Sequence, residues 1–316
     1  MKSDSNARQL QIGSSSLPVP PIVVGCMRIS AKTAVETNRF AHAALDCGLN
    51  YFDHADIYGD GKCEELFGEA LAGDADIRRE NLIIQSKCGI RKDRPTSFYD
   101  FSAEHILEAI DGSLKRLKTD YLDVLLLHRP DALMEPEEVA EAFDKLSSSG
   151  KVRAFGVSNQ KPSQIELLKK YVMQPLIINQ LQLSIPVSNM IASGMEVNME
   201  TPGSVEHDGS ILDYCRLNDM TIQAWSPFQM PAWKGPFIGA EEYRELNNVL
   251  SELAEQYRVT PTVIAAAWVL RHPARMQLVT GTASEERLRE IKAAETICLS
   301  REEWYQLYLA AGHPLP

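Results

Sequence analysis

Hydrophobic and polar positions alternate with two different periods along most of the chain. Short apolar runs of strand length are each followed by a longer segment in which apolar residues recur at helical spacing. Eight such runs are evident, at residues 21–25, 51–54, 82–87, 121–128, 154–158, 177–183, 221–226 and 277–281. Segments 102–117 and 135–148 carry clear helical signals, with a serine opening the first and a glycine shortly after the second. The pattern predicts strands that alternate with helices, which is typical of a parallel sheet.

The strand runs also indicate how this sheet is covered. Residues 124–127 are four consecutive apolar side chains, so both faces of that strand need apolar neighbours. Eight strands of this kind with helical returns predict a closed (β/α)8 barrel, the TIM barrel. The alternative is an open doubly wound sheet, which normally carries G-x-G-x-x-G after its first strand, whereas this chain has Gly25-Cys-Met-Arg28.

Several segments depart from the eightfold rhythm. Residues 13–21 are rich in turn formers and predict a hairpin that leads into the barrel and closes its bottom. Residues 186–209 and 227–239 are too long for ordinary strand-to-helix loops, and the first is expected to cover a binding site. Residues 301–311 predict an extra C-terminal helix. No linker or repeat is visible, so we expect one domain over residues 1–316.

Composition narrows the classes of partner. The net charge is −11 and no basic face is visible, which argues against a nucleic-acid partner. The six cysteines are scattered without a C-x-x-C pair, as in a reducing compartment. Neither a signal-peptide core nor a membrane-length apolar stretch is present, so we expect a cytoplasmic protein that acts on a small molecule without a membrane partner. The oligomeric state stays open, with a monomer among the possibilities.

Titratable side chains end three successive strand runs. Asp53, Lys87 and His128 each follow an apolar run, and Tyr58 lies five residues after Asp53 on a loop. In a barrel of this class the active site lies at the carboxyl ends of the strands, so we expect the four side chains to meet there. An ammonium lowers the pKa of a nearby phenol, a carboxylate keeps the ammonium charged, and a neutral imidazole polarises a carbonyl oxygen. Together they would form a proton-donating unit.

Four spaced motifs carry a family resemblance. YFDHADIYG (51–59), SKCG (86–89), LLLHRPD (125–131) and FGVSN (155–159) resemble successive signatures of the aldo-keto reductases, in order along the chain. The amino-acid sequence around these motifs is similar to that of a bacterial branch of oxidoreductases in that family. The resemblance implies an NADPH-dependent reduction of aldehyde or ketone carbonyls to alcohols by hydride transfer. Asp53, Tyr58, Lys87 and His128 match the catalytic tetrad, with Tyr58 as general acid.

The resemblance also implies a set of residues that bind the cofactor. The nicotinamide carboxamide would be contacted by Ser158, Asn159 and Gln180, and Trp225 would stack on the ring. Ser226 would contact the pyrophosphate. The 2′-phosphate would be held by Thr282 and Arg287. Three positions depart from many relatives. His54 replaces a small hydroxyl residue, Gly281 a phosphate-binding lysine, and Ile291 a polar contact to adenine.

Two other functions remain open on the sequence. The barrel and its cofactor could serve as a regulatory or binding subunit, although all four catalytic positions are present. A metal-dependent barrel hydrolase would use His54, Asp56 and His128 as ligands, but the eighth strand ends without a carboxylate or histidine, and we expect no metal. The expected walls of the substrate pocket favour an apolar carbonyl compound, and they are Met27, Phe228, Trp233, Phe237 and the 186–209 segment.

Overall fold

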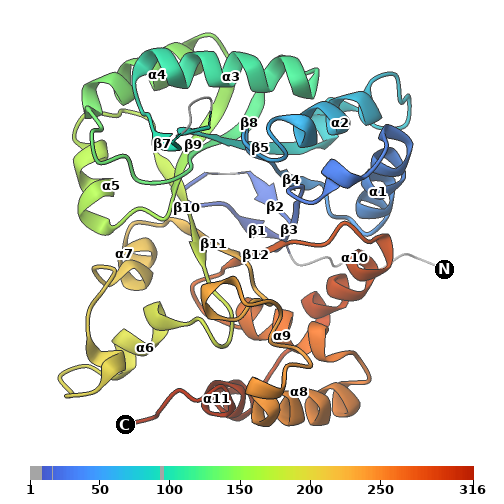
Figure 1. Ribbon diagram of the computed structural model, residues 1–316, viewed down its shortest axis with the longest axis vertical. Helices are drawn as coiled ribbons and strands as arrows, with labels where there is room; N and C mark the ends of the chain where they lie inside the picture. Colours follow the sequence, from blue (N-terminus) through green and yellow to red (C-terminus); the bar gives the residue numbers. More distant parts are fainter. Residues whose placement is uncertain (1–8, 16, 93–95) are drawn as a thin grey trace.

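The barrel is the central feature of the computed structural model, which describes residues 9–15, 17–92 and 96–316. Eight parallel strands close on themselves in the order β3, β4, β5, β8, β9, β10, β11, β12 (Figure 1). Their bounds are Ile22–Gly25, Tyr51–Asp53, Ile83–Cys88, Leu122–Leu127, Val152–Ser158, Leu176–Gln182, Thr221–Trp225 and Gln277–Thr280. Each strand falls on one of the eight apolar runs, which confirms the predicted (β/α)8 architecture.

The helices form the outer layer around the barrel (Figure 1). The longer ones are α1 (Ala34–Asp46), α2 (Lys62–Leu71), α3 (Ala103–Leu117), α4 (Pro136–Ser148), α5 (Pro162–Lys169), α8 (Arg244–Tyr257), α9 (Pro261–Leu270), α10 (Glu285–Lys292) and α11 (Arg301–Ala310). Helix α3 begins where the sequence predicted, because the Ser102 side chain accepts a hydrogen bond from the backbone N–H of His105. Within the described ranges, no helix is long and apolar enough to cross a membrane.

A hairpin closes one end of the barrel, as the turn-rich lead-in predicted. Strands β1 (Leu10–Gln11) and β2 (Pro18–Val19) pair antiparallel. Leu10, Ile12 and Val19 are buried in one cluster with side chains that point into the barrel, among them Tyr51 and Val124. These apolar side chains fill the floor and leave the carboxyl ends of the strands as the open end, which we call the mouth.

Close approach of two strands accounts for one glycine near the mouth. Gly25 ends β3 beside β12, and a Cβ atom there would lie 2.1 Å from the backbone oxygen of Thr280. That distance is far below van der Waals contact, so glycine is required where these strands meet.

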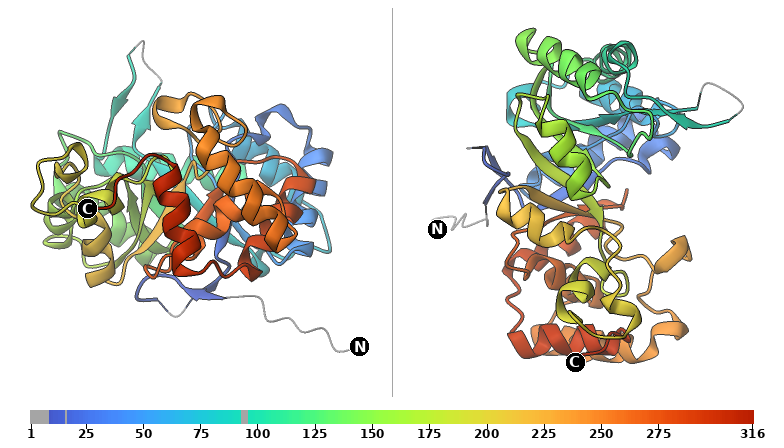
Figure 2. Two further views of the ribbon diagram at one scale, coloured as in Figure 1. Left: turned by 90° about the horizontal axis from the view of Figure 1, so that it is seen from below. Right: turned by 90° about the vertical axis from the view of Figure 1, so that its left-hand side faces the viewer.

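A second hairpin at the mouth escaped prediction. Strands β6 (Ile90–Arg91) and β7 (Phe98–Tyr99) pair antiparallel after β5, and they project from the end of the barrel opposite to β1 and β2 (Figure 2). The two long loops hold short helices: α6 (Asn189–Met195) and η3 (Pro202–Ser204) in 186–209, and η4 (Pro231–Trp233) in 227–239. Helix α7 (Ile211–Leu217) then returns the chain to β11.

Stacked aromatic rings fasten the predicted extra helix, α11. The indoles of Trp268 on α9 and Trp304 on α11 stack at 4.8 Å with an interplanar angle of 7°. Each indole N–H donates to the other residue's backbone oxygen at 3.1 Å. Beyond α11, the His313 Nε2 lies 2.8 Å from the Ile185 oxygen and 2.9 Å from the Ser188 hydroxyl. The end of the chain is therefore tied to the loop that follows β10.

Candidate active site

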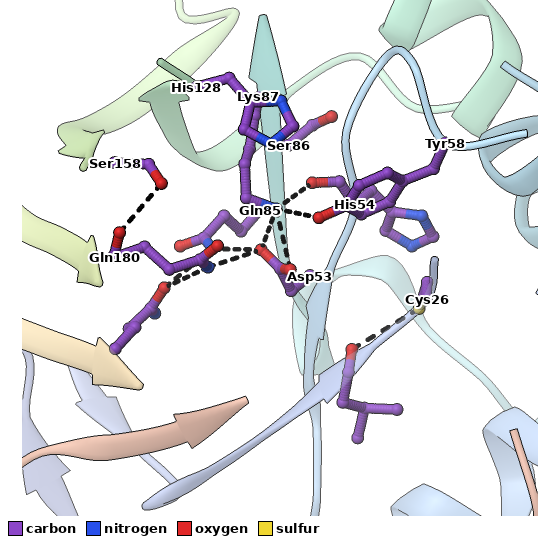
Figure 3. Close-up of polar contacts among 12 residues, drawn as sticks. Cys26, Asp53, His54, Tyr58, Gln85, Ser86, Lys87, His128, Ser158 and Gln180 are labelled. Atoms are coloured by element: carbon purple, nitrogen blue, oxygen red, sulfur yellow. Dashed lines mark hydrogen bonds and ion pairs between the residues drawn. The ribbon is translucent and has the colours of Figure 1, made fainter. Parts of the chain in front are cut away.

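Three of the four predicted catalytic side chains are bonded to one another at the mouth (Figure 3). The Lys87 Nζ lies 2.7 Å from Asp53 Oδ1 and donates to the Tyr58 hydroxyl at 3.1 Å. Its remaining hydrogen bond goes to the His54 backbone oxygen at 2.8 Å. Lys87 is completely buried and Asp53 is 2% exposed. The three N–H bonds of the ammonium are thus all used inside the protein.

The buried ammonium of Lys87 remains charged. Burial opposes the charged form and is the largest single influence on its pKa. The nearby Asp53 carboxylate and the Tyr58 hydroxyl favour the charged form, and together they raise the pKa of Lys87 above its ordinary value. The site therefore holds a fixed positive charge against the Tyr58 hydroxyl.

The pKa of Tyr58 differs from the sequence-based expectation. The expected lowering by Lys87 is present, but burial has the larger effect and raises the pKa of the Tyr58 phenol overall. The expectation of a net lowering was wrong because a charged neighbour was weighed without the loss of solvation. Tyr58 accordingly stays protonated, which is the form that donates a proton.

His128 completes the group as a neutral imidazole. Its ring meets the Tyr58 ring edge-on, with centroids 6.0 Å apart and an interplanar angle of 82°. Burial, followed by the charges of Lys87 and Arg129, holds the pKa of His128 well below its usual value. Its Nδ1 has no hydrogen-bond partner among the described residues. The neutral ring can therefore donate to a ligand without carrying a charge.

A second polar group lies on the neighbouring strands β9 to β11. The Trp225 Nε1 donates to Asn159 Oδ1 at 3.1 Å, and the Asn159 Nδ2 donates to the Ser158 hydroxyl at 2.7 Å. Ser158 in turn donates to the Gln180 backbone oxygen at 2.9 Å. The Trp225 ring also stacks on Trp233 of the following loop, at 5.2 Å. A flat aromatic face beside hydrogen-bonding groups fits the carboxamide-bearing ring of a nicotinamide.

The residues expected to contact phosphates lie after β11 and β12. Ser226 has a left-handed backbone with φ of 53°, directly after Trp225. Thr282 is nearly buried and accepts a hydrogen bond from the Ser284 backbone N–H at 3.0 Å. Arg287 is exposed in the first turn of α10, whose N-cap is Ser284. The guanidinium of Arg28 reaches the space left open by Gly281, 4.0 Å from the position of a Cβ atom there.

Sequence reasoning missed a polar network inside the barrel. Four buried residues from four strands join Asp53 and Gln180 by hydrogen bonds, and they are Tyr51, Gln85, Gln223 and Gln277. The three glutamines had one sequence signal, a glutamine inside a strand run, as in 82–87 and 221–226. Whether such a side chain faces the interior or the helices depends on strand register, which the runs alone did not fix.

The alternative metal site finds no geometric support. No group of three or more His, Cys, Asp and Glu side chains within the described ranges could hold a metal ion. His54 is fully buried against the Phe67 ring at 4.6 Å, and neither ring nitrogen has a partner in the described part of the chain. Burial lowers the pKa of His54 to about 3. Its side chain is a neutral packing group, and only its backbone oxygen serves the lysine.

The predicted pocket walls divide into exposed and buried residues. Met27 and Trp233 are 48% and 63% exposed, so both are available to a ligand. Phe228 is partly buried against the main hydrophobic core. Phe237 is completely buried in that core, so its assignment as a wall residue was wrong. An aromatic residue on a long loop gave no sign of how deeply the loop folds back.

Comparisons with known proteins agree over nearly the whole chain. The model of the aldo/keto reductase family matches residues 21–308. An uncharacterised oxidoreductase, YcsN of Bacillus subtilis, is 36% identical over 281 residues, which are 86% of this chain and 87% of that protein. A 6-dehydroglucose reductase of Novosphingobium aromaticivorans is 34% identical over 315 residues, with coverages of 97% and 96%. A solved aldo-keto reductase of Klebsiella pneumoniae in complex with NADPH is 26% identical, with a TM-score of 0.76 and coverages of 98% and 96%.

Proposed function

Because the chain belongs to the aldo/keto reductase family and is thus an oxidoreductase of carbonyl compounds, we propose that it reduces aldehydes or ketones with NADPH and uses Tyr58 as proton donor. One observation carries the proposal. A fully buried ammonium, Lys87, contacts both the Asp53 carboxylate and the Tyr58 hydroxyl at the mouth of the barrel. That arrangement stabilises negative charge on the phenol oxygen at the moment it gives up its proton.

The roles of the four side chains follow from this contact. Tyr58 donates its hydroxyl proton to the carbonyl oxygen as that oxygen becomes an alkoxide. Lys87 stabilises the phenolate that is left, and the buried carboxylate of Asp53 balances the charge of the buried Lys87. The neutral imidazole of His128 donates a hydrogen bond that holds the carbonyl oxygen beside Tyr58.

The second polar group is proposed to hold NADPH, which when bound supplies the hydride. Ser158, Asn159 and Gln180 would bind the carboxamide, while Trp225 would pack against the ring. The contacts of Trp225 with Asn159, and of Asn159 with Ser158, keep these groups in one arrangement. The related structure with NADPH, at 98% coverage of this chain, supports the same cofactor here.

The phosphates are proposed to bind between β11 and α10. Ser226 would contact the pyrophosphate, and Thr282 with Arg287 would hold the 2′-phosphate that distinguishes NADPH from NADH. Backbone N–H groups at the start of α10 favour anions, and a guanidinium binds phosphate through a planar fork. Arg287 is exposed and points from the first turn of this helix, which suits a ligand that arrives from solvent.

The test is the Tyr58→Phe variant in a single-turnover reaction. We expect wild-type protein premixed with NADPH to oxidise it on addition of an aldehyde, across a panel of apolar and sugar-derived carbonyl compounds. The variant should bind NADPH normally but lose roughly 100-fold or more of the rate. Unchanged turnover in the variant would show that Tyr58 is not the donor. Cofactor binding without turnover of any carbonyl in the wild type would favour a binding subunit instead.

A further inference from the structure

A chain of buried amides crosses the barrel interior beneath the proposed cofactor site. Gln180, Gln223 and Gln277 are neighbours in register on β10, β11 and β12, so their side chains point to the same face. All three are at most 3% exposed. The Gln277 Nε2 donates to the Pro20 backbone oxygen at 2.7 Å, and the Gln277 Oε1 accepts from the Gln223 Nε2 at 3.0 Å.

The direction of this chain is fixed from its Pro20 end. A backbone carbonyl can only accept, so Gln277 must present its nitrogen to Pro20 and its oxygen to Gln223. Gln223 then turns its nitrogen toward Gln277 and also donates to the Tyr51 hydroxyl at 3.2 Å. Its oxygen consequently faces the other way and requires donors.

Two amide nitrogens meet the Gln223 oxygen. The Gln180 Nε2 lies 3.0 Å away and the Gln85 Nε2 lies 2.9 Å away. Both nitrogens also donate to Asp53 Oδ1, which as a carboxylate oxygen can only accept (Figure 3). The Tyr51 hydroxyl completes the set by donating to the Gln85 Oε1 at 2.8 Å. The two accept-only ends, Pro20 and Asp53, therefore demand the same orientation of every amide between them.

A reversed Gln180 amide would be strongly disfavoured in this setting. Its oxygen would then face both the Asp53 carboxylate and the Gln223 oxygen, with no hydrogen between any of them. The reversed amide would lose the two hydrogen bonds that its nitrogen now donates, and the lone pairs of three oxygens would repel one another in a buried site. The Gln180 Oε1 accepts no hydrogen bond from any residue that the structure describes, so it is the atom of this amide left for a ligand.

We propose that Gln223 is a positioning residue which locks Gln180 with its oxygen toward the cofactor. The proposed function supplies the contact between Gln180 and the nicotinamide carboxamide, and the inference rests on it. If the Gln180 oxygen is held toward the cofactor, it can only accept a hydrogen bond, so it favours a pyridine-ring substituent that carries an N–H donor. The amide of NADP⁺ has that donor, and an acetyl group in its place does not.

Equilibrium binding of two dinucleotides tests the proposal without turnover. The probes are NADP⁺ and its 3-acetylpyridine analogue, in which a methyl group replaces the carboxamide nitrogen, and the readout is the ratio of their dissociation constants by titration calorimetry. We expect the wild type to bind the analogue at least about fivefold more weakly, because the buried Gln180 oxygen is left unpaired. In Gln223→Met the Gln180 nitrogen keeps Asp53 Oδ1 as its one acceptor among the described residues, so the reversed amide loses one of its two penalties and the ratio should fall to about half of the wild-type value or less.

Two further variants separate orientation from general damage. In Gln223→Glu the new carboxyl group, protonated beside the Asp53 carboxylate, keeps a carbonyl acceptor for Gln180, so the preference for NADP⁺ should be retained. Gln160→Met makes the same exchange at a position 2% exposed whose amide takes no part in the network, and it should also retain the preference. If Gln223→Met does not fold, Tyr51→Phe combined with Gln277→Met asks the same question, because it removes both acceptors of the Gln223 nitrogen.

The outcomes are distinct from a failure of the proposed function. A wild type that binds both dinucleotides equally overturns the locked orientation. A Gln223→Met variant that keeps the wild-type ratio overturns the positioning role of Gln223, and neither result affects the proposed function. A wild type that binds neither dinucleotide overturns the proposed cofactor together with this inference. Loss of the ratio in Gln160→Met as well as in Gln223→Met would assign the effect to nonspecific disturbance of the barrel and also overturn the proposal.

Discussion

Removing the ammonium of Lys87 is the sharpest perturbation of the proposed chemistry. The Nζ lies 3.1 Å from the Tyr58 hydroxyl. Two full charges at that distance interact by about 5 kcal/mol at an effective dielectric constant of about 20. If about half a charge develops on the phenol oxygen at the transition state, Lys87→Met forfeits about 2.7 kcal/mol, or roughly a hundredfold in rate.

The same substitution also has a cost in stability. It leaves the Asp53 carboxylate, 2% exposed, without its cation, and breaking a buried ion pair from one side typically costs about 3–5 kcal/mol. A slower enzyme could then reflect partial unfolding. The double variant Lys87→Met with Asp53→Asn removes the orphaned charge, so we expect it to recover most of the lost stability and none of the lost rate.

The assay is single-turnover oxidation of NADPH by a saturating aldehyde at a temperature where circular dichroism shows each variant folded. We expect the affinity for NADPH to change by less than about threefold in Lys87→Met, because Lys87 contacts Asp53, His54 and Tyr58. A single variant that turns over at the wild-type rate refutes the role of the ammonium. A double variant that regains activity along with stability shows that folding, rather than charge at Tyr58, was lost.

Three other predictions follow from contacts at the site and in the barrel. Burial, followed by the charge of Glu64, raises the pKa of Asp56 to about 7. The neutral carboxyl group therefore contributes to the free energy of unfolding fully below pH 3.8, and this contribution is lost as the pH rises through about 7. Asp56→Asn should therefore gain on the order of 2–4 kcal/mol over the wild type at pH 8, and little at pH 4, in thermal unfolding. Arg287→Ala should weaken NADPH binding by about tenfold or more and leave NADH binding nearly unchanged in fluorescence titration. Gly25→Ala should cost about 1–3 kcal/mol in urea unfolding, because the new methyl group meets the Thr280 oxygen at 2.1 Å.

Each of these has a control or a contrary result. Equal stabilisation of Asp56→Asn at both pH values would mean that the carboxyl group does not titrate in the folded protein. Equal losses of NADPH and NADH affinity in Arg287→Ala would place the guanidinium elsewhere than on the 2′-phosphate. Gly194→Ala, where nothing lies within 4 Å of the new atom, is the matched control for Gly25→Ala and should be neutral or slightly stabilising.

The strands and helices were predictable because their signals are local. Each of the eight barrel strands coincides with an apolar run, and α3 starts at the serine that caps it. The β6–β7 hairpin was not predictable in this way. Its strands have two residues each, Ile90–Arg91 and Phe98–Tyr99, which is too short for a period of two to be recognised.

The residues of the site likewise divide into those with a local sequence signal and those whose properties depend on long-range contacts. The side chains at strand ends, Asp53 and Lys87, were expected to meet because the carboxyl ends of parallel strands share one edge, and the structure bonds them. The direction of the Tyr58 pKa was missed because burial is a property of the assembled mouth. The network through Gln223 was missed because it joins strands up to 172 positions apart in the chain.

His313 anchors the loop that follows β10, and it is not one of the proposed catalytic or cofactor-binding residues. Through Ile185 and Ser188 its imidazole holds a segment that is also joined to the next loop, where the Ser184 hydroxyl donates to the Gln229 oxygen at 2.8 Å. A substitution at position 313 should therefore alter the loops that follow β10 and β11 at the mouth. Directed evolution of substrate selectivity should therefore include position 313 together with the residues that face the mouth.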